Sequence, residues 1–262
     1  MGRPQKRADV ERALEQILLA DFPVLNIDLI YGGEQSIEQW LRSLEAALQW
    51  RPEELYLYPL YVRPLTGLGR LARDWDDHRL AAYRAAREVL LSRGYEQLSM
   101  RMFRASHADE ITGPVYCCQA DGMIGLGCGA RSYTTRFHYA DRYAVRQNGI
   151  AKVIDQYVAK DASSFATANY GFHVDDEDRR RRYVILTLLQ AAGIDREDYR
   201  CHFHTDVLGD FPQLGQLEQV ELATATDAGV TLTPAGLERS DAIGPWLYSH
   251  KVRQRMEAYQ WA

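Results

Sequence analysis

The stretch VLNIDLIYGG, residues 24 to 33, decides the fold class of this chain. It is apolar except at Asn26 and Asp28, and it ends at two consecutive glycines. A short apolar run bounded by turn residues predicts a strand buried on both faces, as in a parallel sheet. Asp28 stands out there, because burying a carboxylate without a partner costs free energy.

Helical and extended patterns alternate around this strand. Apolar residues recur with helical spacing in three segments, 8–20, 36–50 and 76–93. Asp9 and Ser36 are the expected N-caps, and Gly94 is the expected glycine after the third helix. The extended runs ELYLYPLYV, from residue 54, and YEQLSMRMF, from residue 95, complete the alternation. The pattern predicts parallel βαβ units with right-handed crossovers, and about three such strands indicate only the back half of a larger α/β domain.

Composition excludes several classes of protein. The 262 residues are 46% hydrophobic and 26% charged, with a formal net charge of −5, which is typical of a globular protein and gives no electrostatic case for nucleic acid. The first fifteen residues are charged and lack the apolar core of a signal peptide. No apolar run approaches the ~20 residues that a membrane span needs. We therefore expect a cytoplasmic protein with neither a nucleic acid nor a membrane partner.

The character of the chain changes after residue 105. Glycines, tyrosines and short β-prone runs dominate, and helical patterns then return at 145–160 and 175–192. In the second of these helices, acidic residues 175–178 precede the arginines 179–182, for which we favour a solvated helix face over a phosphate-binding patch. The sequence predicts three regions: α/β units at 1–105, a glycine- and tyrosine-rich connecting region at 106–170, and a helical region at 171–262.

The last region carries the signature of a small β-wing. Asp227 to Gly229 predict a hairpin turn, and Thr233 and Pro234 predict the start of a helix. A helical segment followed by such a hairpin is winged-helix-like. Residues 206–221 are acidic, which favours a docking module over a reader of DNA.

The four cysteines do not form a recognisable metal site. They lie at positions 117, 118, 128 and 201, without CxxC spacing, and we expect free thiols. The stretch CHFH leaves an alternative open, because Cys201, His202 and His204 could hold a metal or haem iron with His138 or His173 nearby. Histidines without a metal are the interpretation that we favour, so no metal ligand is predicted.

Four segments carry a family resemblance. They are NIDLIYG (26–32), LYLYPLYVRPLT (55–66), GLGCGARSY (125–133) and LTPAGLERSDAIGPWL (232–247). In order and spacing they resemble landmarks of the radical S-adenosylmethionine proteins related to oxygen-independent coproporphyrinogen III oxidase and the haem chaperones. The resemblance covers nearly the whole chain. It implies the back half of a partial (β/α)6 barrel, followed by a mainly helical carboxy-terminal domain with a small β-wing.

The resemblance also implies a set of cofactor-binding residues. Arg3, in an element that also holds Gln5, lies 25 residues before Asp28, and both Arg3 and Asp28 fall on positions that contact S-adenosylmethionine in the family. Tyr61 falls where the backbone approaches a second S-adenosylmethionine, and Arg131 falls in the loop that closes over the first. The full implied set is Arg3, Asp28, Ile30, Tyr61, Gly127 and Arg131.

Three features of the implied site remain open at this stage. The family usually has small or apolar side chains where this chain has Tyr61 and Arg131. For Asp28, a structural carboxylate that pairs with an arginine or caps a helix is the alternative to a ligand contact. No catalytic residue is identified.

The cluster-binding motif of the family is not in this sequence. Radical chemistry needs a [4Fe–4S] cluster held by a CxxxCxxC loop, which the family places upstream of the Arg3 element. We therefore expect the chain to start about halfway through the family's barrel and to be inactive alone. The implied function is the carboxy-terminal part of a coproporphyrinogen-oxidase-like protein that handles a tetrapyrrole, with an upstream half or partner chain covering the open barrel edge. The alternative is a non-catalytic binding or accessory protein.

Overall fold

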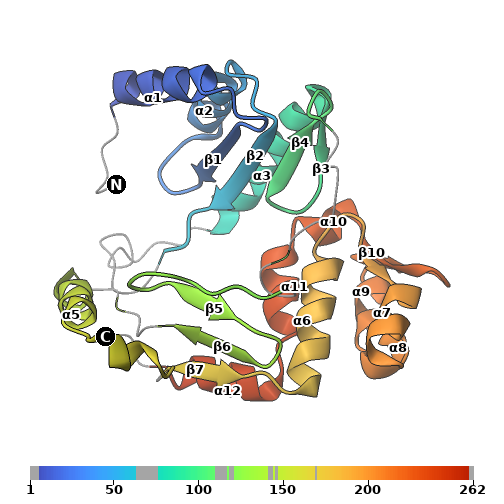
Figure 1. Ribbon diagram of the computed structural model, residues 1–262. Helices are drawn as coiled ribbons and strands as arrows, with labels where there is room; N and C mark the ends of the chain where they lie inside the picture. The colour runs from blue at the N-terminus through green and yellow to red at the C-terminus, as the bar shows by residue number, and fades with distance from the viewer. Residues whose placement is uncertain are drawn as a thin grey trace. The chain divides into compact units, whose positions relative to one another are not determined.

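The computed structural model divides the chain into two compact units (Figure 1). The residues described are 6–62, 76–109, 117, 121–140, 144, 147–168 and 170–259. Unit 1 comprises Met1–Tyr61, Arg73–Ile111 and Gln190–Ala192, and unit 2 comprises the remainder. Arg3 and Gln5 lie outside the described residues, as do Cys118 and the stretch 63–75.

Unit 1 is built around one four-stranded sheet. Its elements are α1 (Arg7–Leu19), β1 (Asn26–Tyr31), α2 (Ile37–Leu48), β2 (Glu54–Pro59), α3 (Asp76–Ser92), β3 (Tyr95–Gln97) and β4 (Met102–Ala105). The strand order is β1-β2-β4-β3, and β1 is parallel to β2 as the alternation predicts. The expected third strand is instead a hairpin, and its second strand β4 runs antiparallel to β2. The chain reverses at Ser99, whose side-chain oxygen accepts hydrogen bonds from the backbone of Arg101 and Met102.

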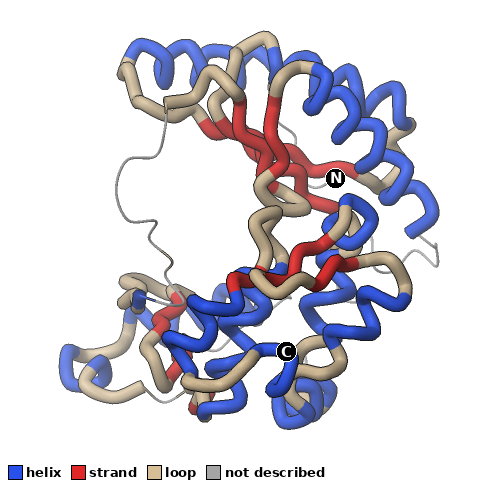
Figure 2. The backbone as a smooth tube through the Cα atoms, turned by 90° about the vertical axis from the view of Figure 1, so that its right-hand side faces the viewer, coloured by secondary structure: helices blue, strands red, loops and turns tan. Residues whose placement is uncertain are grey.

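The prediction that β1 is buried on both faces is wrong. Ile27, Leu29 and Tyr31 point toward the core, whereas Asn26, Asp28 and Ile30 are exposed or nearly so on the other face. The helices lie on one side of the sheet (Figure 2), where Tyr31 packs with ring centroids 5.7 Å from Trp40 of α2 and 6.0 Å from Tyr83 of α3. Although β1 is mostly apolar, its side chains therefore alternate between one covered face and one open face of the sheet.

Local signals for the helix ends of unit 1 are mostly confirmed. Ser36 caps α2 and forms a reciprocal capping box with Gln39. Gly94 follows α3 at φ +80°, a conformation that glycine adopts without strain. Asp9 is not an N-cap, because α1 begins earlier and Lys6 occupies the cap position.

Unit 1 also includes a short segment from late in the sequence. Gln190 forms a β-bridge with Ser99, and the backbone N–H of Ala191 donates to the carbonyl of Leu98 at 2.8 Å. The β3–β4 turn is therefore covered by residues that follow it by about ninety positions in the chain.

Unit 2 contains two small antiparallel sheets and most of the helices. Its elements are β5 (Arg131–Tyr133), β6 (Phe137–Ala140), α5 (Gln147–Val158), η2 (Ala162–Phe165), β7 (Gly171–His173), α6 (Asp176–Leu188), β8 (Ile194–Asp195), α7 (Arg196–Phe203), α8 (Val207–Asp210), α9 (Leu214–Gln219), β9 (Ala223–Ala225), β10 (Gly229–Leu232), α10 (Pro234–Leu237), α11 (Ser240–Trp246) and α12 (His250–Glu257). One sheet has the order β5-β6-β7 and the other β8-β10-β9.

The predicted hairpin and helix start near residue 230 are confirmed. β9 and β10 pair antiparallel around the turn at Asp227, Thr233 caps α10 through the N–H of Gly236, and Pro234 occupies the first turn. The expectation of a solvated arginine face on α6 is wrong for three of the four arginines. Arg180 pairs with Asp210 at 3.3 Å, and its Cζ lies 5.7 Å from the ring centroid of Phe203. Arg181 donates to the carbonyl of Leu247 at 2.8 Å, and Arg182 donates to His138 at 2.7 Å.

Among the residues that the structure describes, no helix combines the length and the apolar character that a membrane span requires.

Candidate functional site

The open face of the unit 1 sheet brings two of the predicted site residues together. The parallel register of β1 and β2 sets Asp28 opposite Tyr56 and Ile30 opposite Tyr58, with all four side chains on the face that carries no helix. The rings of Tyr56 and Tyr58 stack with centroids 6.1 Å apart and planes 15° from parallel. Two stacked tyrosine rings therefore lie beside the Asp28 carboxylate on this face.

Tyr61 joins this face through a residue that the sequence did not indicate. Arg101, in the β3–β4 turn, donates from Nη2 to the Tyr61 hydroxyl at 2.7 Å, and its Cζ lies 5.6 Å from the Tyr58 ring centroid. Tyr61 itself is 49% exposed. The sequence does not indicate Arg101, because the pattern of residues 95–103 predicts one continuous strand. We call Asp28, Tyr56, Tyr58, Tyr61 and Arg101 the open-face cluster.

The charges on this face act on the two phenols. Burial raises the pKa of Tyr58, the nearby Asp28 carboxylate raises it further, and the Arg101 guanidinium partly opposes both. Burial also raises the pKa of Tyr56, with Glu54, Tyr58 and Asp28 adding to the effect. Both hydroxyls therefore stay protonated at neutral pH, and that of Tyr56 donates to the sulfur of Met102 at 3.0 Å.

Asp28 has no strong partner among the described residues. Asn26 donates from Nδ2 to Oδ1 of Asp28 at 3.0 Å, and no described cation lies within ion-pair distance of the carboxylate. This part of the structure thus contains neither the arginine pair nor the helix cap of the structural alternative. The carboxylate is exposed and retains capacity to accept hydrogen bonds from a ligand.

The other two predicted residues lie in unit 2. Gly127 adopts φ +105° in the loop before β5, and Arg131 is exposed at the start of that strand. The loop needs its first glycine for space, because a Cβ on Gly125 would lie 2.9 Å from the Cβ of Ala130. Gly127 lines a hollow of about 500 Å³ together with α5 and η2.

Sequence reasoning missed the residues on the far side of this hollow. The Lys160 Nζ lies 5.3 Å from the ring centroid of Tyr157 and 5.5 Å from that of Phe165. Tyr157 and Lys160 are three positions apart in a predicted helix, so helical periodicity could have paired them. Phe165 comes from the separate turn η2 and had no such signal.

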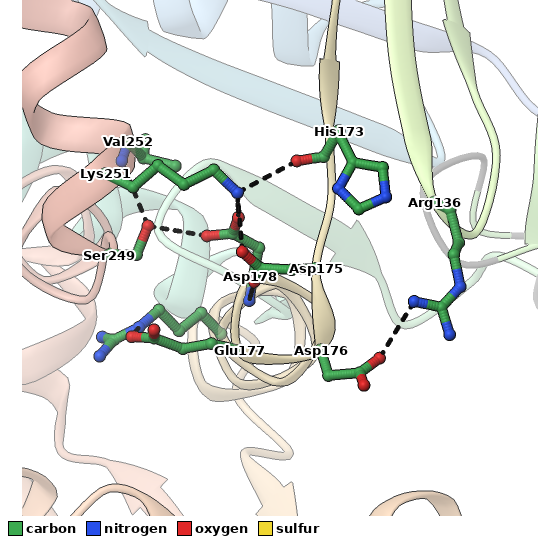
Figure 3. Close-up of polar contacts among 10 residues, drawn as sticks. Arg136, His173, Asp175, Asp176, Glu177, Asp178, Ser249, Lys251 and Val252 are labelled. Carbon is green, nitrogen blue, oxygen red and sulfur yellow. Dashed lines mark hydrogen bonds and ion pairs between the residues drawn. The ribbon is translucent and has the colours of Figure 1, made fainter.

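A polar cluster joins α6, β7 and the start of α12 (Figure 3). Lys251 Nζ donates to Asp175 at 2.7 Å, to Asp178 at 2.9 Å and to the carbonyl of His173 at 3.3 Å. The Ser249 hydroxyl donates to the other oxygen of Asp178 at 2.7 Å. We call Asp175, Asp178, Ser249 and Lys251 the lysine cluster.

The lysine cluster has the chemistry of a structural anchor. Hydrogen bonding to Lys251 lowers the pKa of Asp175, and the two carboxylates raise the pKa of Lys251, Asp175 foremost. Asp178 is buried, and both its oxygens have partners. These groups satisfy one another, so the cluster ties α12 to α6 and β7.

The histidine alternative finds no support. Cys201, His202 and His204 lie at the end of helix α7, where residues two apart point in different directions, and not on a strand. His202 Nδ1 lies 2.8 Å from the carbonyl of Asp198. Over the described part of the chain, no three His, Cys, Asp or Glu side chains gather into a metal site, and Cys117, Cys128 and Cys201 are free thiols.

Comparisons with known proteins relate the chain to one group. No protein-family model matches the chain. Oxygen-independent coproporphyrinogen III oxidase of Pseudomonas aeruginosa is 23% identical over 256 residues, which cover 90% of this chain and 54% of that protein. The haem chaperone HemW of Synechocystis is 29% identical over 139 residues, 50% of this chain and 34% of that protein.

A solved structure shows the fold. Coproporphyrinogen III oxidase HemN from Escherichia coli, a radical S-adenosylmethionine enzyme, aligns with a TM-score of 0.70 at 18% identity, covering 94% of this chain and 59% of that one. The chain thus spans about a third to a half of the length of these two curated relatives.

Proposed function

We propose that this chain, a homologue of oxygen-independent coproporphyrinogen III oxidase and the haem chaperones, serves as the carboxy-terminal portion of a radical S-adenosylmethionine protein. In this proposal its open-face cluster contributes one side of the S-adenosylmethionine site. Arg3, Ile30, Gly127 and Arg131 complete the contacts that the family resemblance implies. The proposal also includes a tetrapyrrole as substrate or cargo, the class of compound named in the relatives' own descriptions.

The observation that carries the proposal is the open face of the unit 1 sheet. One carboxylate, two stacked phenols and a guanidinium lie together on a surface that unit 1 does not cover with a helix. Asp28 can accept hydrogen bonds from amino or hydroxyl groups, and tyrosine rings stack favourably against a purine. S-adenosylmethionine offers both kinds of group and a positive charge that suits the carboxylate.

The residues of this chain do not fit an iron–sulfur cluster. A [4Fe–4S] cluster requires thiolates at fixed positions, and the cysteines at 117, 118, 128 and 201 lack the CxxxCxxC spacing. We therefore assign cluster binding and radical formation to residues outside this sequence. A non-catalytic binding protein is the second candidate, because the contacts proposed for the open face do not include a cluster.

The edge of β1 supports a role for additional polypeptide. Among the described strands β1 pairs only with β2, so it forms an edge of this sheet. We propose that an upstream half or a partner chain adds a strand at this edge, with main-chain hydrogen bonds providing the affinity.

Equilibrium dialysis with S-adenosylmethionine tests the assignment of the open face. We expect saturable binding to the chain, weakened about 5- to 150-fold by Asp28→Asn, since a hydrogen bond to a charged group contributes about 1 to 3 kcal/mol. The matched control is Glu38→Gln, which changes an exposed carboxylate of α2 that pairs with Arg42. Absent binding, or equal affinity in both variants, contradicts the proposal.

A further inference from the structure

Unit 2 contains a second hollow that none of these roles uses. It has a volume of about 530 Å³ and lies among the β5-β6-β7 sheet, α6 and α12. Its walls are mainly apolar, with the rings of Tyr133, Phe172 and Tyr248 and the aliphatic side chains of Ile185, Leu186 and Val252. A hollow of this size and lining suits a small organic molecule with an apolar body.

A cation without a carboxylate partner lies in the wall. Arg182 of α6 is half-buried, and it donates from Nη1 to His138 Nε2 at 2.7 Å, which requires a neutral imidazole there. Its other acceptors are the carbonyls of Thr134 and Thr135, each at 3.4 Å, and no described carboxylate lies within ion-pair distance. Burial lowers the pKa of Arg182 and the charge of Arg179 lowers it further, while Cys117 opposes both effects. Partial burial of this unpaired charge costs free energy, and a bound anion would offset that cost.

A second cation lies at the mouth of the hollow. Arg255 of α12 places its Cζ 5.0 Å from the centroid of the Phe172 ring, and its side chain makes no ion pair with a described residue. The Phe172 ring and this guanidinium both belong to the lining of the hollow. Arg182 and Arg255 both lie in the lining with unpaired positive charge.

The remaining charged groups of the lining are already neutralised. Asp178 belongs to the lysine cluster and is bonded to Lys251 and Ser249 (Figure 3). Arg181 pairs with Glu177 at 2.8 Å. His138 is held neutral, since burial lowers its pKa and the Arg182 charge lowers it further. The net charge available to a ligand in this hollow is positive.

We propose that this hollow is a binding site for an aromatic carboxylate, with the ring against the apolar wall and the carboxylate against Arg182 and Arg255. Guanidinium groups match the geometry of a carboxylate, and ring pairs favour an aromatic body over an alkyl chain. None of the lining residues belongs to the proposed S-adenosylmethionine contacts, and the site needs no cluster.

Fluorescence titration of the full chain with 2-naphthoate tests the proposal. The matched ligand is 2-naphthalenemethanol, which has the same ring system without the charge. We expect saturable naphthoate binding that is at least about tenfold tighter than binding of the alcohol, the effect of one charge-assisted hydrogen bond. Arg182→Gln should weaken naphthoate binding about tenfold, and Arg255→Gln, at a more exposed position, about threefold.

Two controls make the result decisive. Arg253→Gln changes an exposed arginine on the same helix outside the lining, so naphthoate affinity should stay unchanged. Arg255→Gln keeps the test valid if thermal unfolding shows that Arg182→Gln impairs folding. Equal affinity for acid and alcohol, no saturable naphthoate binding, or naphthoate affinity that Arg255→Gln leaves unchanged overturns the proposal. S-adenosylmethionine dialysis of Arg255→Gln should match the unchanged chain, so failure here is distinct from failure of the proposed function.

Discussion

Asp28 illustrates how a single residue on a strand can be exposed although its neighbours in sequence are apolar. The carboxylate accepts one hydrogen bond from Asn26 and has no described ion pair. We expect Asp28→Asn to change the free energy of unfolding by less than about 0.5 kcal/mol, as is usual for surface positions. Urea denaturation measures it. A loss of about 3 kcal/mol or more would reveal an ion-paired carboxylate instead.

Lys251 occupies the opposite kind of environment. Lys251→Met leaves Asp178, which is 7% exposed, with only the Ser249 hydroxyl as a partner for its charge. We expect a loss of about 2 kcal/mol in the free energy of unfolding, less than for a fully buried pair because the lysine is partly exposed. Urea denaturation gives the value.

A double variant and a control separate charge from packing at this position. Adding Asp178→Asn to Lys251→Met should recover part of the loss, since the unpaired charge is then gone. Lys152→Met, on the exposed surface of α5, should leave stability nearly unchanged. If the double variant were less stable than Lys251→Met, the lysine cluster would not be the electrostatic anchor described above.

At the scale of elements, Asp206 joins the helices α7 and α8. Its Oδ1 accepts from the N–H of Leu208 at the start of α8, and its Oδ2 accepts from Arg196 at 2.8 Å and Arg200 at 2.7 Å. Hydrogen bonding to Arg196 is the largest of the effects that lower the pKa of Asp206 from 3.8 to about 2. The folded state therefore favours the charged carboxylate.

This shift predicts how stability depends on pH. A carboxylate with a lowered folded-state pKa contributes stability above its unfolded value, and the contribution disappears as pH falls from about 4 through about 2. Asp206→Asn should be less stable than the unchanged chain at pH 6, and the difference in melting temperature should shrink toward pH 2. Calorimetry at successive pH values checks this. A constant difference would exclude ionisation of Asp206 as its source.

Elements whose signals are local could be predicted from the sequence. Ser36, Gly94 and Thr233 act within a few residues of themselves, so their roles follow from sequence alone. The open face of β1 could not be predicted in this way. An apolar run fits a strand covered on one side or on both, and only the packing of α2 and α3 decides which.

The residues of the candidate sites also differ in whether the sequence could indicate them. Asp28 and Gly127 were accessible through the family resemblance. Arg101, Lys251 and the pair of Arg182 with His138 were not, because each contact joins residues about 40 to 80 positions apart. Sequence spacing carries no information about which distant side chains meet.

At the scale of the whole molecule, the cysteine pattern limits the chemistry that the chain can perform alone. We expect reconstitution with iron and sulfide under anaerobic conditions to produce no cleavage of S-adenosylmethionine, because the thiolate triad is not in the sequence. Chromatographic assay for 5′-deoxyadenosine measures the outcome. Its formation, together with loss of activity in Cys117→Ala or Cys118→Ala, would reverse the assignment of the cluster to other residues.

Gln190–Ala192, the late segment of unit 1, has a consequence for synthesis on the ribosome. These residues leave the ribosome about 85 positions after β4 ends at Ala105, which at about 5 to 20 residues per second is a delay of roughly 4 to 17 s. During that interval the β3–β4 turn lacks its bridge to Gln190 and its hydrogen bond from Ala191. The β3–β4 turn is thus exposed throughout this interval, which gives a chaperone that holds emerging chains time to act there.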